Sequence, residues 1–397
     1  MATRDAFWQG TVRGLSHAVV GGSQVVEGVH RAVLDKVARY APVPPAVPVI
    51  TRLVYGSVRE VARLAGLGGE ELLRATAGDN VAEPVEEWQL HAQSALNAAF
   101  GDYLEETAHP WALPMTFCHG GRVLNPAPEA IDASLSNPSP HLVVFIHGLG
   151  MNELAWTPAQ GDGFAAVLEA ECQATCLFLR YNTGRHIHEN GGELADQLQR
   201  LIEAYPRPVA SLTLVGHSMG GLVARSATYY AAQAQLPWLS RLAGVACLGS
   251  PHQGAPLELA GNWFTHALHF TPYTAPLASV GRRRSAGIKD LRFGSLRAED
   301  WDSRGKDDVE HFTPHPVPLQ KQAHYLVVGS TIQDGGSGVG KWLGDGIVPI
   351  ESAMNLREET DVPSSRLTKH RFAGIGHIEL LSHEKVGKVL LDWYREL

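Results

Sequence analysis

The chain has 397 residues, of which 44% are hydrophobic and 19% charged, and its formal net charge at pH 7 is −8. The apolar content is ample for a packed core and excludes a disordered chain, whereas the mild acidity argues against a nucleic-acid-binding protein. Four cysteines in so long a chain do not make a disulfide scaffold, and reduced thiols are expected.

The sequence contains no apolar run of the signal-peptide or membrane-spanning type. Its first residues, MATRDAFWQGTVRG, mix charged and apolar side chains. Targeting signals and membrane spans both need an uninterrupted apolar segment. We therefore expect a cytoplasmic protein.

The first part of the chain shows helical periodicity. Apolar residues recur at helical spacing in three stripes, namely Val26, Val29, Val33 and Val37; Leu53, Val54, Val58 and Val61; and Trp88, Ala95, Leu96, Ala99, Phe100, Tyr103 and Leu104. The proline-rich segment 40–48 separates the first two stripes, because proline breaks a helix interior. We assign residues 1–125 to a helical N-terminal region, whose apolar stripes would pack on the rest of the protein, on a second copy, or on a membrane surface.

The remainder, residues 126–397, alternates apolar runs with amphipathic helical patterns. Strands are expected at HLVVFIHG (141–148), TCLFLRYNTG (175–184), SLTLVG (211–216), GVACLGS (244–250) and HYLVVGS (324–330). Strands that are apolar throughout, separated by helices, indicate a mostly parallel sheet covered on both faces. The C-terminal helix is expected to bury Val386, Val389, Leu390, Trp393 and Leu397.

A long segment, 256–320, interrupts this alternation. It carries the aromatic-rich stretch GNWFTHALHFTPYTAPL. Long insertions between strands are commonly functional, so we interpret it as a cap or lid. Its aromatic residues either line a pocket for an apolar substrate group or pack the cap onto the body; they are Trp263, Phe264, Phe270 and Tyr273.

The segment Leu212–Thr228, LTLVGHSMGGLVARSAT, contains the pattern Gly-x-Ser-x-Gly between an expected strand and an expected helix. A sharp strand-to-helix turn exposes the serine hydroxyl and needs glycine beside it, because Cβ atoms would clash. The alternative is an ordinary serine at a helix N-terminus. The flanking strand and helix favour Ser218 as a nucleophile, with His217 beside it as a candidate pocket residue.

A serine nucleophile needs a base and an orienting acid, which follow it in the chain in this type of fold. His377 lies in a glycine-flanked loop, AGIGHIELL, whereas His370 lies in an expected strand and His383 on the final helix. Asp334 and Asp345 both precede glycine. Asp345 is favoured because Ile347–Pro349 would hold its loop rigid.

The transition state also needs donors for the oxyanion. The turn FIHGLG, residues 145–150, ends the first long strand of the sheet and can supply a backbone N–H opposite that of the residue after the nucleophile. Leu149 and Met219 are the predicted donors. The alternative is that the glycines of this turn serve only to end the strand.

Two other histidine-containing segments are candidates for a metal site or a catalytic role. His186-Ile187-His188-Glu189 has the spacing of a metal pair, but it lacks a clear further ligand in the sequence, so no metal and no cofactor are predicted. His252, in GSPHQGA, precedes every candidate acid and is expected to stabilise its loop or line the pocket.

Five segments together resemble α/β-hydrolases of the bacterial lipase and esterase kind. They are HGLG, VGHSMGGLVAR, GSPHQGAP, GDGIVPIESA and GIGHIELL, in this order between residues 139 and 397. The resemblance implies an α/β-hydrolase fold with Ser218, Asp345 and His377 as the catalytic triad and Leu149 with Met219 as the oxyanion pair. It also implies that the segment 256–320 is a lid. The helical N-terminal region does not match the usual pattern of the family.

The sequence therefore predicts hydrolysis of a carboxylic ester or lipid substrate with an apolar acyl or alcohol group through an acyl-enzyme. Phospholipid or lipid-anchor deacylases, thioesterases and amidases use the same groups and remain alternatives. An alternative of another class is a catalytically idle hydrolase fold that binds partners through its N-terminal helices.

Overall fold

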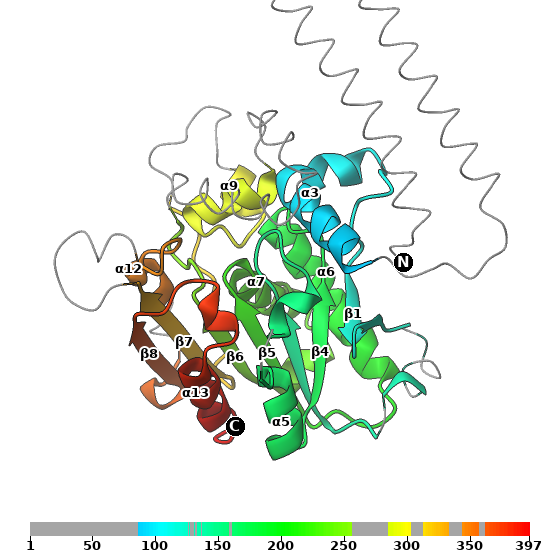
Figure 1. Ribbon diagram of the computed structural model, residues 1–397, viewed down its shortest axis with the longest axis vertical. Coiled ribbons are helices and arrows are strands. Elements are labelled where there is room, and N and C mark those ends of the chain that lie inside the picture. The colour runs from blue at the N-terminus through cyan, green and yellow to red at the C-terminus, as the bar shows by residue number, and fades with distance from the viewer. Residues whose placement is uncertain are drawn as a thin grey trace, which may run out of the picture. The chain divides into compact units, whose positions relative to one another are not determined.

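The computed structural model describes residues 86–125, 137–158, 161–255, 285–302, 313–332, 344–356 and 362–397, with a few positions between 126 and 136. Its contacts divide the chain into two units: Leu90–Glu105 with Ala112–Leu397, and Met1–Gln89 with Glu106–Trp111. The architecture that follows is that of the first unit (Figure 1).

An eight-stranded sheet with the order β2-β1-β4-β3-β5-β6-β7-β8 forms the centre of this unit. Neighbouring strands from β4 to β8 are parallel, whereas β1 runs antiparallel to β2 and to β4. The strands are β1 Thr116–His119, β2 Arg122–Val123, β3 His141–Ile146, β4 Thr175–Arg180, β5 Ser211–His217, β6 Leu242–Leu248, β7 His324–Thr331 and β8 Leu367–Ala373. The two ends of the sheet are thus a two-residue strand and β8, on which Lys369 and Arg371 are exposed.

Helices cover both faces of the sheet. On one face lie α6 Ile187–Ala204 and α7 Met219–Gln233, and on the other α5 Phe164–Cys172 and α13 Glu384–Tyr394. The other described helices are α3 Glu87–Glu106, α9 Ala286–Phe293, α10 Glu299–Asp302 and α12 Ile350–Met354. Short 3-10 turns occupy Glu153–Trp156, Pro237–Arg241, Ser364–Arg366 and Glu379–Leu381. The predicted fold class, a mostly parallel sheet between two helical layers, is confirmed.

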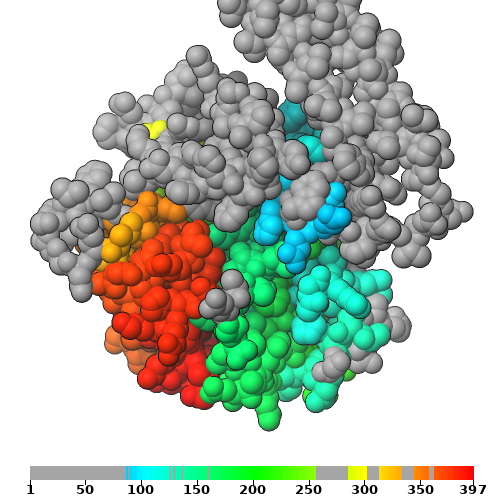
Figure 2. Space-filling view, viewed as in Figure 1, coloured from blue at the N-terminus to red at the C-terminus, as the bar shows by residue number. Residues whose placement is uncertain are grey.

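Alternation along each strand gives the molecule two cores. In β3, Leu142, Val144 and Ile146 belong to the core that α6 and α7 cover, whereas Val143 and Phe145 belong to the core that α5 and α13 cover. Residues of a buried parallel strand are apolar on both faces for this reason. Figure 2 shows the C-terminal segments, orange and red, directly beside the green segments of the middle of the chain.

The body begins earlier in the sequence than residue 126. The sequence predicts a boundary at 125/126 between a helical region and the sheet. In the structure, β1 and β2 precede this boundary and belong to the sheet. These strands are too short to show a clear apolar pattern. The third predicted helical stripe forms α3, and its residues 90–105 contact α9: Ser285 Oγ donates to the Ala98 carbonyl at 2.6 Å, and the Ala286 N–H to Asp102 Oδ2 at 3.2 Å.

The first two helical stripes and residues 256–284 of the predicted cap lie outside the described residues. Of the cap, the structure describes 285–302 and 313–320, which include α9 and α10. Among the helices that are described, none is both long and apolar enough to cross a bilayer.

Candidate active site

The carboxyl ends of the parallel strands meet at one edge of the sheet. The register pairs Ile146 with Gly216, Gly216 with Cys247, and Leu248 with Val328, so the loops that follow β3, β5, β6 and β7 leave the sheet side by side. Ligands of open parallel sheets bind at this edge. The candidate site residues that the structure describes lie in or beside these loops and the loop after β8.

Ser218 occupies a strained turn between β5 and α7. Its backbone has φ 53° and ψ −122°, in a region that residues with a side chain rarely adopt. The turn is tight because two glycines flank it: a Cβ on Gly216 would lie 2.3 Å from Gly221 N, and one on Gly220 would lie 2.1 Å from the Ile146 carbonyl oxygen. The Ser218 N–H donates to the Leu248 carbonyl at 2.8 Å, which fixes the turn against β6.

The loop after β3 lies against Ser218. A Cβ built on Gly148 would be 3.1 Å from Ser218 Cβ, so Leu149 follows directly on a residue that touches the serine. Gly150 has φ 69°, and its N–H donates to Thr183 Oγ1 at 3.1 Å. Met219 is the first residue of α7, and the first N–H groups of a helix have no partner inside it.

Asp345 and His377 form a buried pair. Their side chains are joined at 2.7 Å between His377 Nδ1 and Asp345 Oδ2, and the His377 N–H donates to the Asp345 carbonyl at 3.0 Å. Asp345 Oδ1 accepts the N–H groups of Ile347 (3.1 Å) and Val348 (2.8 Å). The carboxylate is therefore held by backbone, as the apolar anchor after it suggested, and its second oxygen is presented to the imidazole.

The opposite nitrogen of His377 has a different environment. Among the described residues, His377 Nε2 is buried and has no hydrogen-bond partner. Gly249, with φ 62°, lies directly beside the pair, since a Cβ there would be 3.3 Å from both Asp345 Oδ2 and His377 Cε1. A side chain at this position would crowd the imidazole.

His217 connects the serine turn to the histidine loop. Its Nε2–H donates to the His377 carbonyl at 2.9 Å, and the two imidazole rings are 4.7 Å apart. The ring of His217 has no exposed surface. Burial, and then the neighbouring charge of His377, hold the pKa of His217 well below its usual range. His217 was predicted as a pocket residue, but the structure places it in the core, where it positions the loop of His377.

The other histidines that the sequence analysis considered lie away from the Asp345–His377 pair or serve to hold a loop or helix end. His252 is buried, with Nδ1 3.3 Å from Arg225 Nη1, so it stabilises its loop. His370 lies on β8, and His383 caps α13 by accepting the Lys385 N–H. The predicted pocket aromatics Trp263, Phe264, Phe270 and Tyr273, and the alternative acid Asp334, lie outside the described residues.

Thr183 and Gly249 escaped the sequence analysis although both touch the site. Thr183 lies in the segment YNTG directly after β4, and Gly249 directly after β6. Their position at the carboxyl end of a parallel strand is the signal that would have identified them. The structure also brings together three residues that can ligate a metal, His186, His188 and Asp290, of which the third was not anticipated.

Comparison with known proteins gives one family match. A family model described as the PGAP1-like alpha/beta domain matches residues 137–283, which include β3 to β6 and Ser218. No curated protein matches the sequence.

Several of the solved structures that match this chain are lipases or esterases. The mature form of the Bacillus licheniformis lipase BlEst2 is 19% identical, with 65% of this chain and 94% of that chain covered and a TM-score of 0.42. The propeptide form of the same lipase is 18% identical over 71% of this chain and 53% of that chain, with a TM-score of 0.44, so the match spans about half its length. An arylesterase is 13% identical over 89% and 97% of the two chains, with a TM-score of 0.39. With identities and TM-scores this low, none of these structures assigns an activity to this chain.

Proposed function

We propose that this chain, whose fold is that of an α/β-hydrolase, hydrolyses carboxylic esters through an acyl-enzyme formed on Ser218. The observation that carries the proposal is the buried His377–Asp345 hydrogen bond of 2.7 Å, which belongs to the same strand edge as the strained Ser218 turn. A serine on a tight turn together with an imidazole oriented by a carboxylate is the constellation used for acyl transfer.

The proposed reaction has two halves. Ser218 Oγ attacks the ester carbonyl carbon while His377 Nε2 takes the hydroxyl proton, and the carbonyl oxygen becomes an oxyanion that accepts the N–H groups of Leu149 and Met219. Collapse of this intermediate breaks the C–O bond, and His377 gives the proton to the leaving alcohol. Water then attacks the acyl-enzyme with the same proton transfers and releases the acid. Asp345 holds the imidazole in the tautomer with the proton on Nδ1.

The substrate class follows from the sequence of the cap. Four aromatic residues in 256–284 favour an apolar acyl or alcohol group, as in esterases and lipases. Deacylation of a phospholipid or a lipid anchor is a narrower form of the same reaction, and the match to the PGAP1-like family is the reason to include it. A panel of p-nitrophenyl esters of increasing chain length, a phospholipid, a thioester and an amide would separate these alternatives.

The decisive test is covalent labelling with a fluorophosphonate probe followed by mapping of the modified residue. We expect the label on Ser218, its loss in Ser218→Ala, and its retention in the matched control Ser240→Ala, because Ser240 is an exposed serine in the 3-10 turn between α7 and β6. Folded protein that takes no label at Ser218 would overturn the proposal and favour the idle, partner-binding alternative.

Kinetics should agree with the label. Ser218→Ala is expected to lower kcat/KM on p-nitrophenyl esters about a thousandfold or more. Asp345→Asn should lower kcat by about the same amount, because the imidazole is then held in the wrong tautomer. Full activity in either variant would contradict the mechanism.

A further inference from the structure

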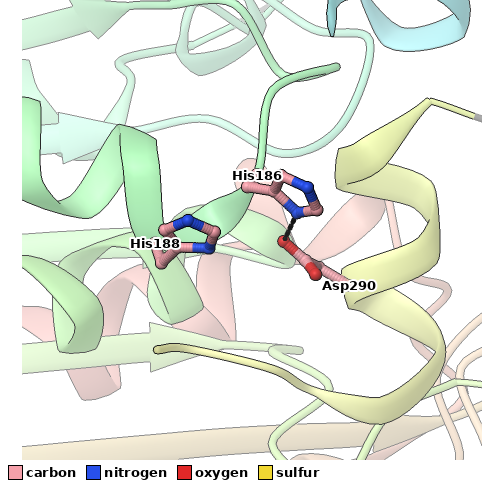
Figure 3. A group of neighbouring side chains, drawn as sticks. All are labelled: His186, His188 and Asp290. Carbon is pink, nitrogen blue, oxygen red and sulfur yellow. Dashed lines mark hydrogen bonds and ion pairs between the residues drawn. The ribbon is translucent and has the colours of Figure 1, made fainter. Parts of the chain in front are cut away.

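Outside the candidate active site, two histidines and an aspartate from distant parts of the sequence converge (Figure 3). His186 is the N-cap residue of α6, His188 lies in its first turn, and Asp290 lies on α9, about a hundred residues later. One ligand atom from each residue lies within 4.8 Å of the other two. We propose that these three side chains bind a divalent zinc ion that fastens α9 to the start of α6.

The donor set is suited to zinc. Two imidazole nitrogens and one carboxylate oxygen, completed by a water molecule, form a common tetrahedral set. Zinc bonds of about 2.0–2.1 Å place neighbouring donor atoms about 3.3 Å apart. His186 Nδ1 and Asp290 Oδ2 are already separated by 3.1 Å, so a shift of the half-buried His188 ring completes the site.

Other hydrogen bonds hold these ligands in place. Asp290 Oδ2 accepts the Ile187 N–H at 2.7 Å, and Asp290 Oδ1 accepts Trp301 Nε1–H at 2.5 Å. Glu189 accepts the His186 N–H at 3.1 Å, so the backbone of this histidine is fixed at the helix start. Metal ligands are typically oriented by such surrounding hydrogen bonds.

A structural alternative explains part of the cluster. The 3.1 Å contact between His186 and Asp290 is satisfied by an ordinary hydrogen bond or ion pair, and Asp290 also caps α6. It does not explain His188, whose ring stacks on that of His186 with 4.9 Å between centroids.

Charge balance also favours a cation at this place. The Asp290 side chain is 1% exposed, and a buried carboxylate is costly unless positive charge compensates it. A divalent ion provides that compensation. The ion would also hold α9 at Gly287, where an added Cβ would lie only 3.0 Å from Met219 Cε, so it would stabilise the helix beside the candidate oxyanion residue.

Zinc binding to the full chain tests the inference without reference to ester hydrolysis. The protein is stripped with a chelator, desalted, titrated with zinc against a competing dye, and analysed for bound metal. We expect one zinc per chain, and a thermal midpoint raised by about 3–5 °C at saturating zinc. With Co²⁺ in place of zinc we expect the visible absorption of a four-coordinate ion.

Three variants make the assignment specific. His188→Ala should weaken zinc affinity at least tenfold and abolish the cobalt absorption while remaining folded, because the His188 ring is only half-buried. Asp290→Asn keeps an oxygen for the Ile187 N–H but loses the charged ligand, and should behave likewise. His141→Ala is the matched control, since this exposed histidine on β3 contacts Ser211 and should bind zinc as the parent does.

Two results would overturn the proposed zinc site. Parent protein that binds no zinc at micromolar concentration and neutral pH would overturn the inference. Equal zinc affinity in the parent and in folded His188→Ala would do so as well, because the ion would then lie elsewhere.

Discussion

Thr183 is a single residue on which the geometry of the candidate oxyanion turn depends. Its buried hydroxyl accepts the Gly150 N–H at 3.1 Å, one residue after Leu149. Thr183→Val keeps the shape of the side chain but removes the acceptor. We expect kcat for ester hydrolysis to fall about tenfold with little change in KM, because the role proposed for the Leu149 N–H is to bind the oxyanion of the transition state.

Thr183→Ser provides the control for this prediction. It retains a hydroxyl at the same position and should keep most of the activity. If the valine variant turned over substrate as fast as the parent, or if the serine variant lost as much activity, the turn would not depend on this hydrogen bond.

Candidate residues that lie in a recognisable local sequence motif could be predicted from the sequence. Residues that reach the site only through contacts with distant parts of the chain could not. Ser218 lies between Gly216 and Gly220 on a strand-to-helix turn, and Asp345 and His377 each directly follow a glycine, so the local sequence was enough to nominate them as candidates. Thr183 acts through Gly150, and Asp290 meets His186 and His188 only in three dimensions. The place of His217 beside the serine suggested a pocket residue, whereas its buried ring and its hydrogen bond to the His377 carbonyl became visible only in three dimensions.

Two adjacent glycines of α6 show how closely this helix approaches α7. A Cβ on Gly191 would lie 2.2 Å from Ser226 Oγ and 2.9 Å from the Ser226 carbonyl carbon, whereas a Cβ on Gly192 would meet nothing within 4 Å. Gly191→Ala should therefore lower the free energy of unfolding by about 1–3 kcal/mol through overpacking. Gly192→Ala should raise it by about 0.5–1 kcal/mol, because alanine is the better helix former.

Urea denaturation of the two variants side by side measures this difference, and each serves as the control for the other. Shifts of the same sign would show that the distance between α6 and α7 is not what restricts position 191.

Among the elements, sequence predicted best those with long apolar runs. The expected strands became β3 to β7, the run around His370 became β8, and the C-terminal stripe became α13. Leu397 was wrongly included in that stripe, because α13 ends at Tyr394 and Leu397 is exposed. The sequence analysis missed β1 and β2, because four- and two-residue strands with mixed burial carry no period that distinguishes them from loops. That omission moved the predicted start of the sheet body too far along the chain.

At the scale of the whole molecule, two fully buried histidines should make stability depend on pH. Burial is the main cause that lowers the pKa of His147 from 6.5 to about 4, and the pKa of His217 is lowered in the same direction. At a pH between the ordinary and the lowered pKa, each of these histidines is protonated in the unfolded chain but neutral in the folded protein. The free energy of unfolding should therefore fall as the pH drops from about 6.5 towards 4, with His147 alone contributing up to about 3 kcal/mol.

Urea unfolding at about pH 7 and about pH 5 measures this effect. His147→Phe preserves the ring that stacks on Tyr181 at 4.5 Å but cannot titrate, so its stability should change less over the same interval. Identical slopes for the variant and the parent would show that His147 does not contribute.

The two outer strands of the sheet determine how readily it can pair with strands of other protein molecules. An open sheet presents unpaired N–H and C=O groups at its outer strands, and these invite strands from other molecules to add on. Here one outer strand, β2, is only two residues long, and the other, β8, exposes Lys369 and Arg371. A short edge offers little to pair with, and an edge with positive charges repels its own copies. Both outer strands of the described sheet are therefore poorly suited to pairing with a strand of another molecule.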